Sequence, residues 1–305
     1  MTRPEFPSVL DSTIIATFRS CPQHAFRAYI QHYKPQGLSV HLHAGAAYAA
    51  GLEAARLAYY VDKQPEDACV AAGIQALLTH YGSYACPPDS AKSAERMCGA
   101  LEFYFDRYPM ATDPAVPITL ASGKRGIEVS FAEPIDILHP VTGDPLIYCG
   151  RLDQAVSMEN MTLGEDDKTA SQLGASWPRQ WDLRSQFTGY VWGMSRLGIK
   201  LDGFLVRGVS ILKTKYDTMQ AITYRPEWQI DRWYTQLLRD AKRMIECWEE
   251  GYFDFNLDHA CAEYGGCPLR NVCLAKDPSA ILQLQYERRV WNPITRTETL
   301  IEPPQ

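Results

Sequence analysis

The sequence predicts an α/β protein, in which helices flank a mixed central sheet, with a helical N-terminal part and a cysteine-rich C-terminal segment. Apolar residues recur at helical spacing through the first third of the chain. In the middle they alternate with polar residues, as in half-buried strands, and a helical segment separates two pairs of such strands. The last segment carries closely spaced cysteines and turn residues instead of either period.

The N-terminal part is expected to consist of helices. Residues 12–33 begin with a Ser/Thr N-cap, and Cys21-Pro22 interrupts this helix because proline lacks the N–H that would continue it. Helical periodicity then covers residues 44–60, 66–81 and 90–108.

Strands and further helices follow in the order that a mixed sheet requires. Ile127, Val129 and Phe131 alternate with polar residues and mark one strand. The remaining elements are expected as strands at 146–156 and 158–168, a helix at 181–197, strands at 203–212 and 219–224, and a helix at 226–250. A proline at its first turn and Gly251 just past its end support the last helix.

Length and composition indicate an ordinary globular chain. The 305 residues are 46% hydrophobic and 22% charged, which excludes a disordered or fibrous class. We expect a single domain over residues 1–305, with a helical part (1–110), an α/β core (120–255) and a cysteine-rich tail (256–305). The net charge of −6 excludes a globally basic nucleic-acid coat, but a local basic groove is compatible with it.

The expected compartment decides how the cysteines are interpreted. The N-terminus lacks a basic region followed by an apolar stretch, so we expect no secretory signal and a cytoplasmic protein. Glu53 and Arg56 interrupt the Ala-rich segment, so no apolar run is long enough to span a bilayer and no membrane partner is expected. In that compartment, nine cysteines argue against a disulfide framework and favour metal binding or buried thiols.

Carboxylates and a lysine gather in the middle of the chain. The run 150–153 (GRLD) follows an apolar stretch, and 166–169 (DDKT) begins thirteen residues after Asp153. If these strands are antiparallel neighbours, Asp153 and Asp166 meet at one end of the sheet, with Lys168 on the same face. Two carboxylates and a backbone carbonyl suit Mg²⁺ or Mn²⁺, and a nearby lysine can orient or deprotonate a water for phosphodiester hydrolysis. The alternative interpretation is a solvated acidic turn.

These two runs resemble the PD-(D/E)XK nuclease superfamily, in particular its RecB-like branch, in which a G-x-[IL]-D strand precedes a D-x-K-T strand. Gln186 and Tyr190 match the Q-x-x-x-Y helix of that branch and share one helical face. Residues 45–53 (GAAYAAGLE) resemble its first motif, G-x-x-x-H-x-x-L-E. Ala49 replaces the histidine of that motif, and Glu53 lies one turn further along the same helical face.

The resemblance implies a restriction-endonuclease-like core and a metal-dependent DNA nuclease, similar to exonucleases of this branch. Lys168 would position the nucleophilic water, and Glu128 resembles a further acidic position of the family. The expected catalytic residues are Asp153, Asp166, Lys168, Glu53, Gln186 and Tyr190, and the expected ligands of Mg²⁺ or Mn²⁺ are Asp153, Asp166, Asp167 and Glu53. The departure at Ala49 leaves an alternative, a catalytically weakened DNA-binding or assembly protein of the same fold.

The cysteine-rich tail suits a metal site in a turn-rich wrap. Cys261, Cys267 and Cys273 have five residues between each. The sequence resembles RecB-like nucleases such as the AddB nuclease domain and the CRISPR-associated adaptation exonucleases, which hold a [4Fe-4S] cluster through one N-terminal and three C-terminal cysteines. Residues 17–26 (TFRSCPQHAF) resemble the phrase that carries the N-terminal ligand, which here is Cys21. Zinc is the alternative, including a zinc-stapled scaffold with no nucleic-acid role.

DNA contacts are expected beside the start of the 181–197 helix. Arg179, Trp181 and Arg184 interleave an aromatic ring with cations, which suits phosphate contacts and base stacking on a single strand. A solvated face is the alternative interpretation of such a cluster. The resemblance implies a bacterial, archaeal or phage-infected cell. It leaves open whether the protein works with a helicase, recombinase or CRISPR adaptation partner and whether it forms a homo-oligomer. It also leaves open whether the protein acts as an exonuclease or an endonuclease.

Overall fold

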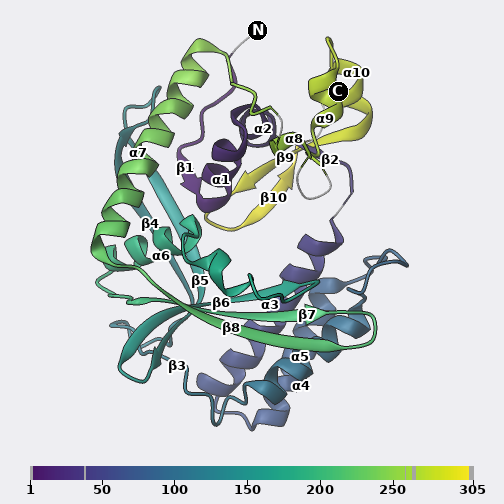
Figure 1. Cartoon of the computed structure of the whole chain (residues 1–305), viewed down its shortest axis with the longest axis vertical. Coiled ribbons are helices and arrows are strands. Elements are labelled where there is room, and N and C mark those ends of the chain that lie inside the picture. The colour runs from purple at the N-terminus through teal and green to yellow at the C-terminus, as the bar shows by residue number, and fades with distance from the viewer. Residues whose placement is uncertain (1–2, 38, 258, 263–265, 302–305) are drawn as a thin grey trace. The chain divides into compact units, whose positions relative to one another are not determined.

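The computed structural model describes residues 3–37, 39–257, 259–262 and 266–301 (Figure 1). The chain forms two compact units that are interleaved in sequence. Two long strands, β4 (Ile127–Leu138) and β5 (Pro145–Met158), have residues in both units. Unit 1 consists of Met1–Gly37, Phe131–Gly150 and Trp228–Gln305, and unit 2 consists of Leu38–Ser130 and Arg151–Glu227.

Unit 2 is built on a mixed sheet with the strand order β5-β6-β7-β8. β6 (Met161–Ala170) pairs antiparallel with the end of β5 across a turn in which Glu159 has a positive φ of 54°. β7 (Gly203–Ile211) runs parallel to β6, and β8 (Tyr216–Tyr224) returns antiparallel to β7. The short β3 (Val116–Pro117) also pairs with β5.

Helices cover both faces of this sheet, as the sequence predicts for its class (Figure 1). On one face, α3 (Val40–Tyr60), α4 (Glu66–Tyr81) and α5 (Ala94–Arg107) share a buried core with Val209 and Ile211 of β7. The other face is covered by α6 (Ser185–Arg196), which follows a 3₁₀-helix (Pro178–Trp181). The Phe187 ring of α6 stacks on Phe204 of β7 with their centroids 4.5 Å apart. We call these two sides the α3 face and the α6 face.

The α3–α4 pair approaches closely at two glycines. A Cβ on Gly73 would lie 2.7 Å from the carbonyl oxygen of Gly51, so a larger residue would force the two helices apart. This close packing gives the Ala-rich α3 a fixed support next to the sheet. Among the described helices, none combines the length and the apolar character that a membrane crossing requires.

Unit 1 contains both terminal segments of the chain. β1 (Val9–Asp11) pairs parallel with the first part of β5, with Val9 opposite Ile147. α1 (Ser12–Ser20) begins at Asp11, whose Oδ1 accepts a hydrogen bond of 2.7 Å from the backbone N of Ile14. β9 (Tyr286–Asn292) lies between β2 (Tyr33–Pro35) and β10 (Thr297–Leu300) in an antiparallel sheet. The other elements are α2 (Pro22–Ala25), a π-helix (Phe26–Ile30), α7 (Glu227–Glu250), α8 (His259–Ala262), α9 (Arg270–Leu274) and α10 (Ser279–Gln285).

The helices and long strands confirm the sequence predictions, and the terminal segments depart from them. β1 and β2 escape prediction because each has only three residues, too few to show an alternating pattern. The tail was expected to lack helix, which is wrong, because Cys261 lies in α8 and Cys273 lies in α9. Residues 263–265 between them lie outside the described part.

Candidate active site

Asp153, Asp166 and Lys168 lie on adjoining strands of unit 2. The ladder between β5 and β6 ends at the pair Gln154–Glu165, and Asp153 and Asp166 are the next residues of the two strands. Because side chains alternate along a strand, Asp166 and Lys168 share the α6 face with Phe204, and the register gives Asp153 the same face. The structure therefore brings together these three predicted site residues.

Short polar contacts fix this group. The Lys168 Nζ lies 2.5 Å from Asp166 Oδ2. Asp153 Oδ2 accepts a hydrogen bond of 2.9 Å from the backbone N of Asp167. Asp166 is only 3% exposed, whereas 31% of the Lys168 side chain is exposed. The ammonium group thus joins a buried carboxylate to solvent, where a substrate could reach it.

The environment disfavours negative charge on both carboxylates. Burial raises the pKa of Asp153, and the negative charge of Asp167 raises it further. Burial also raises the pKa of Asp166 to about 7, with Asp153 adding to the shift and Lys168 opposing it. Burial alone would lower the pKa of Lys168, but Asp166 and Asp153 outweigh it, so the lysine pKa is raised and the side chain is protonated at neutral pH.

Gln186 and Tyr190 lie on α6, which covers this face. The Gln186 Nε2 donates a hydrogen bond of 3.0 Å to the Tyr190 hydroxyl, as the one-turn spacing on a helix allows. The Tyr190 ring packs near Phe204, with centroids 6.0 Å apart, and Tyr190 is close enough to Lys168 for a phenolate charge to raise the lysine pKa. The predicted helix motif is therefore placed beside the carboxylate–lysine group.

Glu128 of β4 adds a carboxylate next to β5, the strand that carries Asp153. Its backbone φ is +52°, a left-handed conformation that a non-glycine residue adopts only when its surroundings hold it. Its Oε2 lies 2.7 Å from Nε of Arg151, which stands two residues before Asp153 on β5. Strained backbone at a site of clustered charge is a common property of functional positions.

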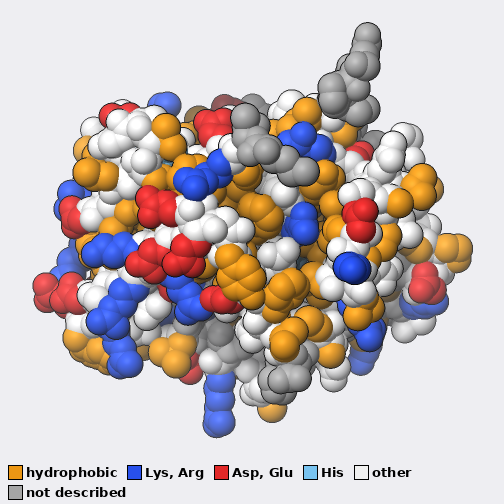
Figure 2. Space-filling view, turned by 90° about the horizontal axis from the view of Figure 1, so that it is seen from above, with side chains coloured by type: hydrophobic (Ala, Val, Ile, Leu, Met, Phe, Trp, Pro, Cys, Tyr) orange, Lys and Arg blue, Asp and Glu red, His pale blue; other side chains and the backbone are white. Residues whose placement is uncertain are grey.

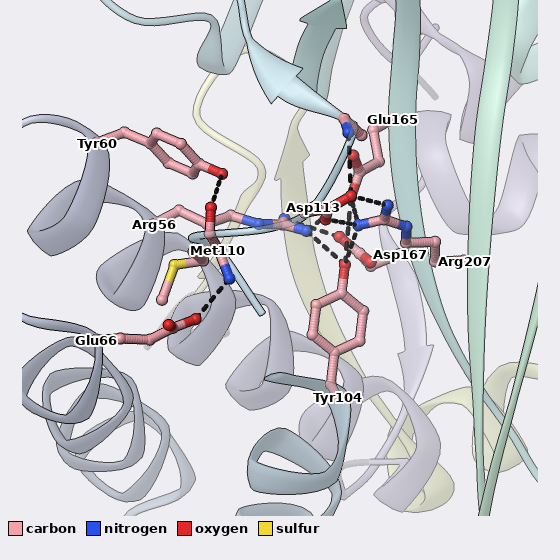
Figure 3. Close-up of polar contacts among 10 residues, drawn as sticks. Arg56, Tyr60, Glu66, Tyr104, Met110, Asp113, Glu165, Asp167 and Arg207 are labelled. Atoms are coloured by element: carbon pink, nitrogen blue, oxygen red, sulfur yellow. Dashed lines mark hydrogen bonds and ion pairs between the residues drawn. The ribbon is translucent and has the colours of Figure 1, made fainter. Parts of the chain in front are cut away.

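The α3 face directly behind the carboxylates is held by a buried charge network (Figure 3). Arg56 of α3 contacts Glu165 Oε1 and Asp167 Oδ2, each at 2.8 Å. Its Nη2 also donates a hydrogen bond of 2.8 Å to the Tyr104 hydroxyl. Asp167 therefore links the two faces, since its carboxylate pairs with Arg56 while its N–H holds Asp153.

A second arginine completes the network (Figure 3). Arg207 of β7 donates two hydrogen bonds to Asp113, at 2.5 and 2.7 Å, and its side chain is 2% exposed. Burial alone would lower the pKa of Arg56 and of Arg207, but the neighbouring acidic groups raise both. Both guanidinium groups therefore stay charged inside the protein and fix β6 from behind.

Two of the expected metal ligands lie elsewhere. The side chain of Asp167 belongs to the α3 face, because residues alternate along β6, and it pairs with Arg56. Glu53 is half-buried on α3, the helix that packs on the α3 face, whereas Asp153 and Asp166 lie on the α6 face. Within the described ranges, no three His, Cys, Asp or Glu side chains are placed to hold one metal ion. The protein thus offers two carboxylates on the α6 face.

Of the three expected DNA contacts, one is buried and two are exposed. Trp181 is 6% exposed and packs against Trp177 and Phe187, with centroids 5.3 and 5.7 Å away, so its predicted stacking on DNA bases is wrong. Arg179 and Arg184 are exposed. On the face shown in Figure 2, the described Lys and Arg side chains are interspersed with Asp and Glu and form no broad basic surface.

The four cysteines of the predicted cluster line one cavity in unit 1. Cys21, Cys261, Cys267 and Cys273 contribute to the walls of a hollow of about 330 Å³. Burial raises the pKa of Cys267 and of Cys273, and the charges of neighbouring thiolates, including Cys21 and Cys261, raise them further. The thiols therefore surround a common space, although Cys21 is more than two hundred residues from the others.

Sequence reasoning missed Arg56, Glu165 and Arg207. The available signal was a run of three acidic residues, 165–167, within one strand. Alternation places those acids on both faces of the sheet, and a covered sheet then requires cations on both faces. Lys168, the cation on the α6 face, follows this acidic run directly, whereas Arg56 and Arg207, the cations on the α3 face, are distant from it in sequence.

Comparisons with known proteins give distant neighbours. No protein-family model matches the sequence, and no curated protein matches it. The chain is similar to a solved structure from Eubacterium rectale named "putative exonuclease", with 11% identity and a TM-score of 0.48, over 84% of this chain and 88% of that chain. It is also similar to the solved structure of SSO0001, with 14% identity and a TM-score of 0.30, over 75% and 85% of the two chains.

Proposed function

We propose that this protein is a metal-dependent DNA nuclease of the PD-(D/E)XK type, acting as an exonuclease, with Asp153 and Asp166 as ligands of Mg²⁺ or Mn²⁺. The observation that carries the proposal is the group of Asp153, Asp166 and Lys168 on one face of adjoining strands, beside Gln186 and Tyr190. These residue types and this order are those of the RecB-like motifs in the sequence.

The donor set suits a hard divalent cation. Asp166 is buried and Asp153 is half-buried next to it, both with raised pKa values, and a cation between them would compensate the charge that desolvation disfavours. Mg²⁺ is commonly held by one or two carboxylates and completes its shell with water and substrate phosphate. When bound, such a metal would supply Lewis acidity and lower the pKa of a water molecule.

Lys168 serves as a donor in this proposal. Its pKa is raised, so the ammonium group holds its protons at neutral pH and orients a water or stabilises charge on the phosphate, rather than acting as a base. Asp166 keeps the ammonium in place at 2.5 Å. Gln186 and Tyr190 form a hydrogen-bonded polar pair on α6, and in this proposal they support the site and its substrate.

Substitution of the carboxylates tests the proposal. Asp153→Asn and Asp166→Asn are each expected to lower Mn²⁺-dependent degradation of end-labelled linear DNA by about 100-fold or more, whereas Lys213→Ala, on an exposed turn, leaves it unchanged. Degradation of linear DNA with closed circular DNA left intact is the expected exonuclease pattern. Equal rates in the wild type and both asparagine variants would refute the assignment of the site.

We also propose that Cys21, Cys261, Cys267 and Cys273 hold a structural [4Fe-4S] cluster. The four thiols line one cavity of about 330 Å³, and four thiolates are the usual ligand set of such a cluster, which supports this proposal. Protein purified without oxygen is expected to be brown and to contain iron and sulfide, which Cys267→Ser lowers and Cys98→Ser does not. Stoichiometric zinc in a colourless wild-type protein would contradict the cluster.

A further inference from the structure

A second cation, Arg151, lies on the α6 face close to the carboxylates. Arg151 precedes Asp153 by two residues on β5, so the two side chains share a face, while Leu152 between them is fully buried. Two residues of a strand span about 7 Å, which sets the spacing of Arg151 and Asp153 along β5. The roles assigned to Asp153, Asp166 and Lys168 leave this arginine unused.

β5 lies between β4 and β6 at this point of the sheet. The backbone N of Ala155 donates a hydrogen bond of 2.7 Å to the Gly126 carbonyl, which joins β5 to the start of β4. The preceding residue, Gln154, pairs with β6 instead. Successive residues of a strand direct their backbone groups to opposite edges, so β4 and β6 lie along opposite edges of β5. The first residues of β4 and the last residues of β6 therefore stand on opposite sides of Asp153.

Glu128 of β4 holds Arg151 by one edge of its guanidinium group. Glu128 Oε2 lies 2.7 Å from Arg151 Nε, and both atoms are buried. Within the described part of the chain, no hydrogen bond or ion pair engages either Nη atom of Arg151. The Arg151 side chain is 36% exposed, comparable with the 31% of Lys168. The ion pair thus draws the guanidinium toward β4, away from Lys168, and leaves two donor groups open to solvent.

The backbone of Glu128 shows that this contact is held against strain. Its φ of +52° is a conformation that glycine adopts freely and glutamate adopts only when its surroundings hold it. The chain therefore keeps a strained glutamate where glycine would suit the backbone. What the glutamate adds is a carboxylate, 15% exposed, placed against Arg151.

We infer that Arg151 binds the backbone phosphate next to the scissile phosphate, and that Glu128 is the positioning residue that aims its guanidinium. This inference rests on the proposed nuclease function. A guanidinium whose Nε is occupied presents two Nη donors in one plane, which matches two oxygens of a phosphate. In the proposed site, the scissile phosphate lies at Asp153, Asp166 and Lys168. Arg151, about 7 Å along β5 and displaced toward β4, meets the next phosphate of the same strand.

Binding in EDTA, where metal-dependent cleavage does not occur, tests the phosphate contact. Fluorescence anisotropy measures the affinity for a fluorescein-labelled oligothymidylate over a range of NaCl concentrations. Arg151→Met is expected to weaken binding about tenfold, because a charge-assisted hydrogen bond is lost. The slope of log K against log salt should fall by about 0.7, the value for one phosphate contact on a single strand. Arg107→Met, an exposed arginine of α5 on the α3 face, leaves affinity and slope unchanged.

Kinetics with Mn²⁺ locate the contact relative to the reacting atoms. A phosphate next to the scissile one is bound equally in the ground state and in the transition state. Arg151→Met is therefore expected to raise KM about tenfold with little change in kcat. A fall in kcat at unchanged KM would overturn the placement of Arg151 beside the neighbouring phosphate.

Glu128→Gly separates orientation from charge. Glycine accepts the positive φ, so this variant is expected to fold. The substitution removes a negative charge, so electrostatic attraction alone would tighten DNA binding. Loss of orientation instead weakens binding severalfold without changing the salt slope. Adding Glu128→Gly to Arg151→Met should then cause no further loss, because the glutamate acts only through the arginine.

Unchanged affinity and slope in Arg151→Met would overturn the phosphate contact, and tighter binding by Glu128→Gly would overturn the positioning role. Cleavage of the same oligonucleotide with Mn²⁺ tests the nuclease function separately. Cleavage by the wild type together with unaltered binding by Arg151→Met refutes the contact alone. Absence of cleavage together with weakened binding by Arg151→Met refutes the nuclease function and keeps a phosphate-binding arginine.

Discussion

Replacing Arg56 by methionine is expected to destabilise the protein by about 3–5 kcal/mol, the cost of leaving buried charge without its partner. The Arg56 side chain is 5% exposed and contacts Glu165 and Asp167, each at 2.8 Å. Glu165 retains Arg207, but only at 3.5 Å, and Arg207 is already engaged by Asp113. Methionine preserves the apolar stem of the side chain, so the loss reports on charge rather than on packing.

An exposed arginine offers a matched control for this variant. Arg243 lies 2.6 Å from Asp254, a distance similar to those of Arg56, but the two side chains are 59% and 47% exposed. Arg243→Met is therefore expected to cost less than about 1 kcal/mol, since solvent screens exposed ion pairs. Burial, not distance, distinguishes the two arginines.

Urea unfolding followed by circular dichroism measures both variants. Adding Asp167→Asn to Arg56→Met is expected to recover part of the lost stability, because the second change removes a buried charge that has lost its partner. Equal losses in Arg56→Met and Arg243→Met would refute the reasoning. A double variant less stable than Arg56→Met would also contradict it.

Further predictions concern pH and packing. The pKa of Asp166 is raised from 3.8 to about 7 in the fold, so the metal-free protein should lose stability as pH rises through about 7, and Mn²⁺ should raise the melting temperature more at pH 8 than at pH 6. Asp166→Asn should remove that difference, and an equal shift at both pH values in the wild type would contradict the metal assignment. A Cβ on Gly164 would lie 2.4 Å from the Phe204 ring, so Gly164→Ala should cost about 1–3 kcal/mol in urea unfolding. Gly174→Ala, where a Cβ meets nothing within 4 Å, is the control. Equal urea unfolding midpoints for the two variants would show that β6 and β7 move enough to accommodate the extra methyl group at Gly164.

Elements with strong local signals were predictable from the sequence. The helix expected at 66–81 has those bounds as α4, because Pro65 precedes it and Gly82, with a positive φ of 55°, ends it. The strands carrying Asp153 and Asp166 were predictable too, since their alternation and the turn between them are local features. Their antiparallel pairing then placed the two carboxylates side by side.

Features made by distant residues were not predictable in this way. The ion pair between Arg56 and Glu165 joins positions 109 residues apart, and nothing in the Ala-rich helix indicates which acid the arginine meets. Trp181 shows the same limit, because neighbouring arginines suggested an exposed ring, whereas contacts with Trp177 and Phe187 bury it. The loop 172–180 places the Trp177 ring over Gly208 of β7, and periodicity does not describe how such a loop folds.

The rate of DNA cleavage by Lys168→Ala tests the central claim most directly. Wild type and variant are compared on an end-labelled single strand over a range of Mn²⁺ concentrations. The account predicts a loss of about 100-fold or more at saturating Mn²⁺, with Mn²⁺ binding retained because Asp153 and Asp166 are intact. Cleavage by Lys168→Ala at the wild-type rate would contradict a catalytic role for the carboxylate–lysine group.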